Sequence, residues 1–160
     1  MSTTPAASHD TTARQRWMGI LARSSAADLE AALDIALDGT GPRPEYEFLR
    51  RPETGLAMVR GRMDGSGRQF NLGEMTLTRC AVRTADGRTG LAYVAGRDLH
   101  QAELAAVLDA LLQDPARRAT ILARAVEPLA RAQARHREAA RARTRATKVD
   151  FFTLVRGEDA

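Results

Sequence analysis

The sequence has few of the residues from which most recognisable sites are built. Its 160 residues include one cysteine, Cys80, and three histidines, His9, His100 and His136, which lie far apart along the chain. A single cysteine cannot form an internal disulfide, and no set of cysteines and histidines has zinc-site spacing. We therefore expect no disulfide, no metal site and a reducing, cytoplasmic setting.

Long hydrophobic runs and familiar nucleotide-binding motifs are also missing. No apolar stretch approaches the roughly 20 residues that span a bilayer, and residues 1–10 lack the regions of a signal peptide. No GxxxxGK[ST] loop is present, and no GxGxxG motif opens a helix after a strand. We expect a chain that does not span a membrane and is not exported by a recognisable signal.

Basic residues outnumber acidic ones, and nearly all of them are arginine. The chain has 24 Lys and Arg against 20 Asp and Glu, a formal net charge of +4, and Lys148 is the only lysine. Arginine can hold phosphate or carboxylate with two hydrogen bonds, so the bias permits an anionic partner. A genome rich in arginine codons would produce the same bias. By itself, the excess of arginine favours this compositional explanation over an anionic partner.

The central part of the sequence alternates strand-prone runs with turn signals. The connections at residues 64–67 and 85–88 contain glycine and are short enough for hairpins. Pro52 is expected to end the first run. The expected strands are Glu45–Leu49, Leu56–Met63, Phe70–Thr84 and Thr89–Arg97. The sequence predicts an α+β fold with an antiparallel four-stranded meander.

Helical patterns flank this sheet in sequence. Ser25 and Asp28 have the spacing of a capping box, and Asp98 is well placed to cap a helix after the last strand. Asp114-Pro115 begins another helix, because proline is tolerated at the first helical position. Pro128 predicts a kink or a restart there. N-terminal and C-terminal helices are therefore expected around the meander.

Composition divides the chain into three parts. We expect a disordered tail over residues 1–12, an α+β domain over 13–129, and an Arg/Ala-rich helix with an extended apolar C-terminal docking segment over 130–160. Residues 130–146 contain no large apolar side chain, so that helix has little to bury. The apolar end beyond it favours anchoring in a partner. The candidate docking residues are Phe151, Phe152, Leu154, Val155 and Arg156.

Arginines alternate with apolar residues in the expected strands. Arg60 and Arg62 share one face of their strand. On the next strand, Arg79 and its neighbour Thr78 point to different faces. If the apolar faces of the strands coincide, these arginines meet on the other face. A solvated face with counter-charges such as Glu53 is the interpretation that alternation alone favours. The candidates for anion binding or an interface are Arg60, Arg62, Glu74, Arg79 and Arg97.

No complete catalytic set is recognisable, so we predict no catalytic residue. Cys80 lies within a strand without a nearby histidine, which favours a buried small side chain over a nucleophile. His100 could act as an acid or base, and a surface histidine is the favoured interpretation. Two function classes remain: a basic nucleic-acid-binding regulatory protein, and a non-catalytic or co-catalytic subunit of a larger enzyme. The apolar C-terminus favours the second.

Six blocks of the sequence carry a family resemblance in the expected order. They are RQRWMGILA from Arg14, YEFLRRPETGLAMVRGRM from Tyr46, FNLGEMTLTRCAVR from Phe70, GLAYVAGRD from Gly90, AELAAVLDALLQ from Ala102 and TKVDFFTLVRGEDA from Thr147. With these blocks the chain resembles the G subunit family of the bacterial phosphonate carbon-phosphorus lyase system. The first dozen residues and the Ala/Arg helix match less distinctively.

The resemblance implies a subunit of a core complex with H, I and J partners and an associated L protein. That family system displaces adenine from ATP with methylphosphonate, which gives ribose 1-methylphosphonate 5-triphosphate. The resemblance implies no cofactor in this subunit, since ATP and an iron-sulfur cluster belong to the assembled system. It carries over no catalytic residue, and it makes nucleic acid an improbable partner.

Overall fold

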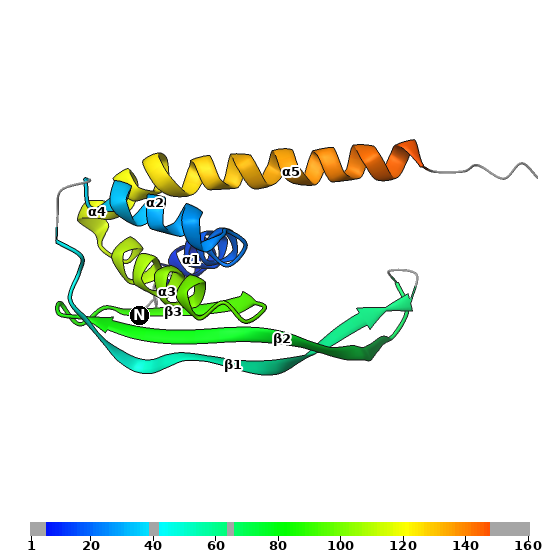
Figure 1. Cartoon of the computed structure of the whole chain (residues 1–160), viewed down its shortest axis with the longest axis horizontal. Helices are drawn as coiled ribbons and strands as arrows, with labels where there is room; N and C mark the ends of the chain where they lie inside the picture. Colours follow the sequence, from blue (N-terminus) through cyan, green and yellow to red (C-terminus); the bar gives the residue numbers. More distant parts are fainter. Residues whose placement is uncertain (1–5, 39–41, 64–65, 148–160) are drawn as a thin grey trace, which may run out of the picture.

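The fold is a three-stranded antiparallel sheet covered by helices on one face. A computed structural model describes residues 6–38, 42–63 and 66–147. Helix α3 lies against the sheet, and α1, α2 and α5 lie above α3 (Figure 1). The elements are α1 (Ala6–Leu21), α2 (Ala26–Ala36), β1 (Tyr46–Arg62), β2 (Gln69–Thr84), β3 (Thr89–Ala95), α3 (Leu99–Leu112), α4 (Pro115–Ile121), the π-helical turn η2 (Leu122–Val126) and α5 (Glu127–Ala146).

The antiparallel meander predicted from the sequence is confirmed, in the strand order β1-β2-β3. The expectation of four strands is wrong, because Glu45–Leu49 and Leu56–Met63 belong almost entirely to the single strand β1. Its pairing with β2 continues through register shifts between Phe48 and Arg50 and between Arg50 and Glu53. Pro52 falls in the second shift of an edge strand, where a missing N–H breaks no ladder.

The core lies on both sides of α3, which packs between the sheet and the helices α1 and α2. Leu104, Leu108 and Leu112 of α3 are buried, as are Val82 and Val94 on the sheet. The approach is close at one glycine of β3, because a Cβ built on Gly90 would lie 1.9 Å from the carbonyl oxygen of Ala106. Alanine-rich α3 and this glycine together let helix and sheet backbones meet.

Helix starts follow the expected caps. Ser25 and Asp28 form the complete capping box of α2, and Asp98 accepts a hydrogen bond from the Gln101 N–H at the start of α3. Asp114 caps α4. At the N-terminus, α1 begins at Ala6, within the segment expected to be a tail, while residues 1–5 lie outside the described part of the chain.

The irregularity expected at Pro128 lies just before it. The backbone from Leu122 to Val126 forms a π-helical turn, in which the Glu127 N–H bonds the carbonyl oxygen of Leu122, five residues back. Helix α5 begins at Glu127, directly after this turn, and Pro128 lies in its first turn. Val126 and Glu127 keep helical backbone angles, so the helix restarts without a break.

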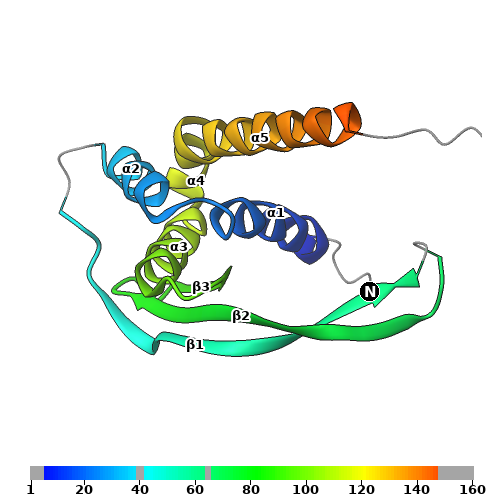
Figure 2. The same ribbon diagram turned by 45° about the vertical axis from the view of Figure 1, so that its right-hand side comes forward.

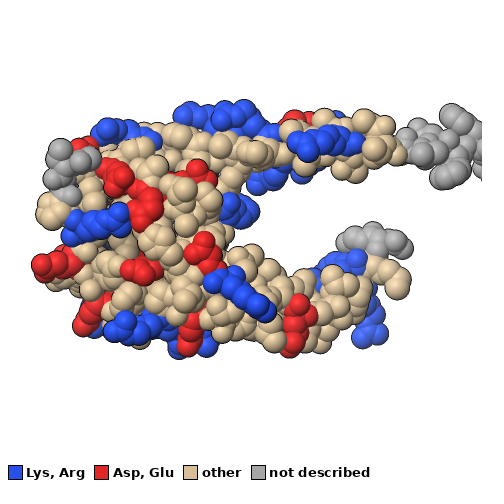
Figure 3. Space-filling view, viewed as in Figure 1, with Lys and Arg blue, Asp and Glu red and all other residues tan. Residues whose placement is uncertain are grey.

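Two elements extend away from the body in the same general direction. Helix α5 continues beyond α2, and the β1–β2 hairpin continues beyond β3 and α3 (Figures 1 and 2). Helix α5 has no buried residue. The space-filling view shows an open hollow between the two elements, with arginines spread along α5 (Figure 3). The protein therefore exposes much more surface than a rounded domain of its length.

Candidate functional site

The most distinctive surface is the projecting end of the hairpin, which we call the hairpin arm. It comprises residues 54–62 of β1, Met63 directly after it, and residues 69–76 of β2. Its large apolar side chains are between 41% and 69% exposed. They are Leu56, Met58, Met63, Phe70, Leu72 and Met75. An exposed apolar patch of this extent is typical of a binding surface.

Strand pairing distributes these apolar groups over both faces of the arm. Leu56 lies opposite Thr76 and Met58 opposite Glu74, on the face that continues toward the helices. Met75 lies opposite Ala57 on the other face. Phe70 is also on that face, because a Cβ built on its partner Gly61 would lie 3.7 Å from the Phe70 ring. Contact with a partner could therefore cover either face.

The arm is also poorly supported by the rest of the chain. An isolated two-stranded hairpin is marginally stable in water, and a third strand or a packed helix is normally needed. Strand β3 reaches only to Leu77 of β2, so β2 and β1 pair alone beyond that point. Covering by another protein would supply the missing support.

The strand arginines do not all meet on one face, as they would if the apolar faces of the strands coincided. Thr54 lies opposite Thr78, and their hydroxyl oxygens are 3.3 Å apart. The even-numbered residues of β1 in the arm therefore share the face of Thr78. Arg60 and Arg62 lie on that face, whereas Arg79 lies on the opposite one.

Arg79 belongs to a charged ladder on the uncovered face of the sheet. Its Nε donates to Glu53 Oε1 at 2.8 Å, and Arg50 donates to the same oxygen at 2.5 Å. The hydrogen bond from Arg50, followed by that from Arg79, lowers the pKa of Glu53 below its usual range. The counter-charge anticipated at Glu53 is confirmed.

The remaining interface candidates are separate. Glu74 lies on the face of Met58, Arg62 donates to the Gly67 carbonyl oxygen at 3.0 Å, and Arg97 is exposed just after β3. The structure thus brings Arg60, Arg62 and Glu74 to one face of the hairpin arm and leaves Arg79 and Arg97 elsewhere. Their part in binding an anion or a partner stays a prediction. The docking residues Phe151, Phe152, Leu154, Val155 and Arg156 lie outside the described residues.

A buried polar centre, not predicted from the sequence, joins α1, α3 and β3. The Asp109 carboxylate is fully buried and accepts hydrogen bonds from Arg14 Nη2 at 2.7 Å and from the Trp17 indole at 2.8 Å. It also accepts the Leu91 N–H at 2.9 Å. In the sequence, the sign of this buried centre was Asp109 itself, an acidic residue within the apolar run of α3. Because every donor comes from this chain, the centre stabilises the fold.

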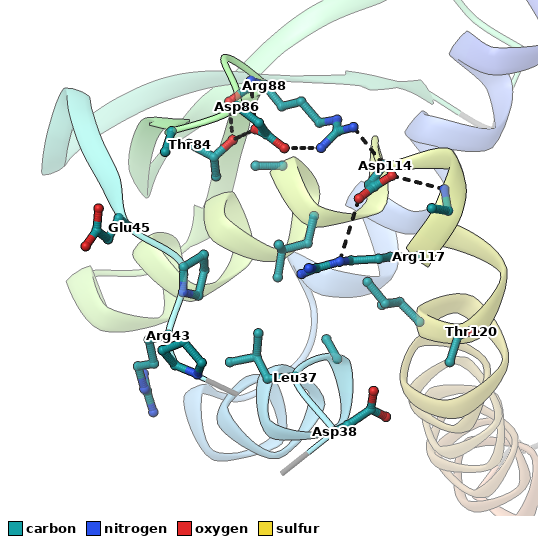
Figure 4. Close-up of a pocket in the computed structure, with 18 residues that line it drawn as sticks. Leu37, Asp38, Arg43, Glu45, Thr84, Asp86, Arg88, Asp114, Arg117 and Thr120 are labelled. Atoms are coloured by element: carbon teal, nitrogen blue, oxygen red, sulfur yellow. Dashed lines mark hydrogen bonds and ion pairs between the residues drawn. The ribbon is translucent and has the colours of Figure 1, made fainter. Parts of the chain in front are cut away.

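A hollow of about 730 Å³ lies between α2, α4 and the β2–β3 turn (Figure 4). Its arginines already face carboxylates: Arg88 pairs with Asp86 and with Asp114, and Arg117 lies 3.7 Å from Asp114. Arg43 pairs with Glu30 at 2.5 Å. The hollow therefore has mixed charge, and none of the described residues that line it is a histidine or a cysteine.

Cys80 and His100 have the settings favoured from the sequence. Cys80 is 2% exposed, and burial raises the pKa of its thiol to about 11, which disfavours the reactive thiolate. His100 is exposed, and its Nε2 lies 2.7 Å from Glu30 Oε1. Across the described ranges, no three His, Cys, Asp or Glu residues are placed to hold a metal ion. No helix in those ranges has the length and hydropathy to cross a membrane.

Taken together, these features define an α+β protein with a three-stranded antiparallel sheet and an apolar hairpin arm that no described element covers. Residues 12–157 match the family model described as phosphonate metabolism protein PhnG. The chain belongs to this family. It is 46% identical over 146 residues to the alpha-D-ribose 1-methylphosphonate 5-triphosphate synthase subunit PhnG of Rhizobium meliloti (strain 1021), with 91% of this chain and 90% of the relative covered.

Proposed function

We propose that this chain is a cytoplasmic subunit of the phosphonate carbon-phosphorus lyase system, assembled with H, I and J subunits and the associated L protein. In that assembly it supports formation of ribose 1-methylphosphonate 5-triphosphate from ATP and methylphosphonate, with release of adenine. Family membership supports the pathway. The exposed apolar hairpin arm is the observation that supports a subunit role.

The role proposed for this chain is structural or co-catalytic. The described residues offer surfaces and a stabilising core, and Cys80 is too buried to act as an accessible nucleophile. ATP and the iron-sulfur cluster are assigned to the assembled system, with no cofactor of its own for this subunit. Its contribution would be to brace the subunits that hold the reacting groups.

Two surfaces would make the contacts. The first is the hairpin arm. The second is the C-terminal segment with Phe151, Phe152, Leu154, Val155 and Arg156, which we propose as an anchor on the I or J partner. In the sequence, its apolar side chains follow residues 130–146, which contain no large apolar side chain.

The hairpin arm is tested by co-expressing the chain with its H, I and J partners and purifying through a tag on this chain. Phe70→Ser combined with Leu72→Ser should reduce recovery of the partners about tenfold or more, because truncation of central apolar anchors commonly costs over 1.4 kcal/mol. Adenine release by the purified material should fall in proportion.

The matched control is Leu99→Ser, which also removes an exposed leucine, 48% exposed, at the start of α3. It should leave partner recovery unchanged. Equal recovery of partners by the arm variant and this control would sink the proposal for the hairpin arm. In the same assay, Phe151→Ala with Phe152→Ala tests the C-terminal anchor, and unchanged co-purification would exclude it.

A further inference from the structure

Strand β3 forms one edge of the sheet, and its ladder shows which backbone groups face outward. The Gly96 N–H donates to the Thr76 carbonyl oxygen, and the Thr84 N–H to that of Arg88. In an antiparallel ladder this fixes the even-numbered residues of β3 as the ones bonded to β2. The N–H and C=O groups of Thr89, Leu91, Tyr93 and Ala95 therefore point away from β2, toward the open edge.

Side chains from the body close the first half of this edge. The carbonyl oxygen of Thr89 accepts hydrogen bonds from Arg14 and from Gln113, at 3.1 and 2.7 Å. The Leu91 N–H donates to the buried carboxylate of Asp109. Here the fold satisfies its outward backbone groups with its own residues.

The second half of the edge is open. Within the described ranges, no group bonds the carbonyl oxygen of Leu91, the N–H and carbonyl oxygen of Tyr93, or the N–H of Ala95. Edge strands are normally protected from pairing by charges, proline or bulges. Strand β3, TGLAYVA, has none of these, and its register with β2 is regular.

An apolar hollow of about 210 Å³ lies beside the strand, where α1 approaches β3. Met18, Gly19 and Ala22 line it from α1, together with Tyr93. Leu91 and Tyr93 are 37% and 59% exposed on the uncovered face of the sheet. An added strand would thus find backbone partners at the edge, an apolar hollow on one face and apolar side chains on the other.

Charge limits what could occupy this edge. Arg97 follows β3 and is exposed. No ion pair joins it to a described residue. A second copy of β3 would bring no carboxylate, because residues 89–97 contain no acid.

We propose that a partner subunit adds an extended segment to β3 between Leu91 and Ala95, as a fourth strand of the sheet. The segment has a large apolar side chain that enters the hollow beside Met18, and a carboxylate that meets Arg97. This inference rests on the proposed function, since the segment belongs to a subunit of the same assembly. Main-chain hydrogen bonds supply affinity, and the hollow supplies selectivity.

Residue-resolved hydrogen exchange on the isolated chain and on the tag-purified complex tests the proposal. In the isolated chain the amides of Tyr93 and Ala95 should exchange rapidly. In the complex they should slow by about 100-fold or more, as hydrogen-bonded strand amides do. The Val94 amide is an internal reference, because it pairs with Thr78 in the ladder and should be protected in both samples.

A matched pair of substitutions separates backbone from side chain. Tyr93→Pro removes an N–H that faces the edge and leaves the bonds to β2, whereas Tyr93→Ala keeps that N–H. Recovery of partners should fall about tenfold or more with Tyr93→Pro and less with Tyr93→Ala. Equal loss in the two variants would contradict strand addition.

The outcomes separate this inference from the proposed function. A complex that forms while Tyr93 and Ala95 still exchange rapidly overturns strand addition and leaves the subunit role intact. If no complex forms with the partners, both proposals fail. Protection of these amides in an isolated chain that sediments as a dimer would identify a second copy as the occupant and overturn the partner segment.

Discussion

Asp109 shows how a single charged residue organises this core. Its carboxylate accepts hydrogen bonds from Arg14, Trp17 and the backbone of Leu91, so one side chain ties α1 and β3 to α3. Every buried polar side-chain atom in the described part of the chain has a partner. The arrangement is stabilising only while it stays complete, because each donor would otherwise be buried without an acceptor.

Asp109→Ala should lower the free energy of unfolding by about 3–5 kcal/mol, because it leaves the Arg14 guanidinium and the Trp17 indole without their acceptor. Urea denaturation of the purified chain measures the change. Asp34→Ala, which removes an exposed aspartate from α2, should alter stability by less than about 0.5 kcal/mol. Similar losses in the two variants would contradict the role of Asp109.

Tyr46 gives a prediction at high pH. Burial, followed by the hydrogen bond to the Glu103 carboxylate, raises the pKa of Tyr46 from 10.0 to about 12. Because the folded-state pKa lies above the unfolded one, this group's contribution to stability is complete below pH 10 and is lost as pH rises toward about 12.

In a tyrosinate absorbance titration, Tyr46→Phe should remove the step near pH 12. The variant should also lose less stability than the wild type between pH 10 and about 12. A wild-type titration that Tyr46→Phe leaves unchanged near pH 12 would show that Tyr46 is not held as described.

The elements show which local signals are reliable. The caps at Ser25, Asp98 and Asp114 could be read from the sequence, because capping depends on residues within one turn. The length of β1 could not be predicted from such local signals. Pro52 normally ends a strand, but the register shifts beside it depend on pairing with β2, which is not local information.

The same limit applies to the faces of the hairpin. Alternation correctly separated Arg79 from Thr78, but the placing of Arg60 relative to Arg79 depends on register between strands. The exposed arm was likewise not predicted, since its alternating sequence resembles that of a half-buried strand. The length of β3 and the position of α3 show that no described element covers it.

Packing of α3 on β3 depends on one glycine. Gly90→Ala should destabilise the chain by about 1–3 kcal/mol, because the new Cβ would overlap the Ala106 carbonyl and displace the helix backbone. Thermal or urea unfolding measures the effect. Gly73→Ala in β2, where no atom lies within 4 Å of an added Cβ, is the matched control and should be nearly neutral.

At the scale of the whole molecule, the protein resembles a component of a larger assembly more than a self-contained domain. It has a well-packed body, a hairpin arm with apolar side chains on both faces, and a long helix with no buried residue. Charge and composition left open the possibility that the chain binds nucleic acid. Family membership favours a role as a subunit of an enzyme complex instead. The projecting surfaces are what such a subunit would offer its partners.

The most direct test is the native mass of the particle obtained when this chain is co-expressed with its H, I and J partners and purified through its own tag. We predict a stable multi-subunit complex that releases adenine from ATP when methylphosphonate and the L protein are supplied. A monomer that leaves those partners behind, although they are expressed and soluble, would contradict the account.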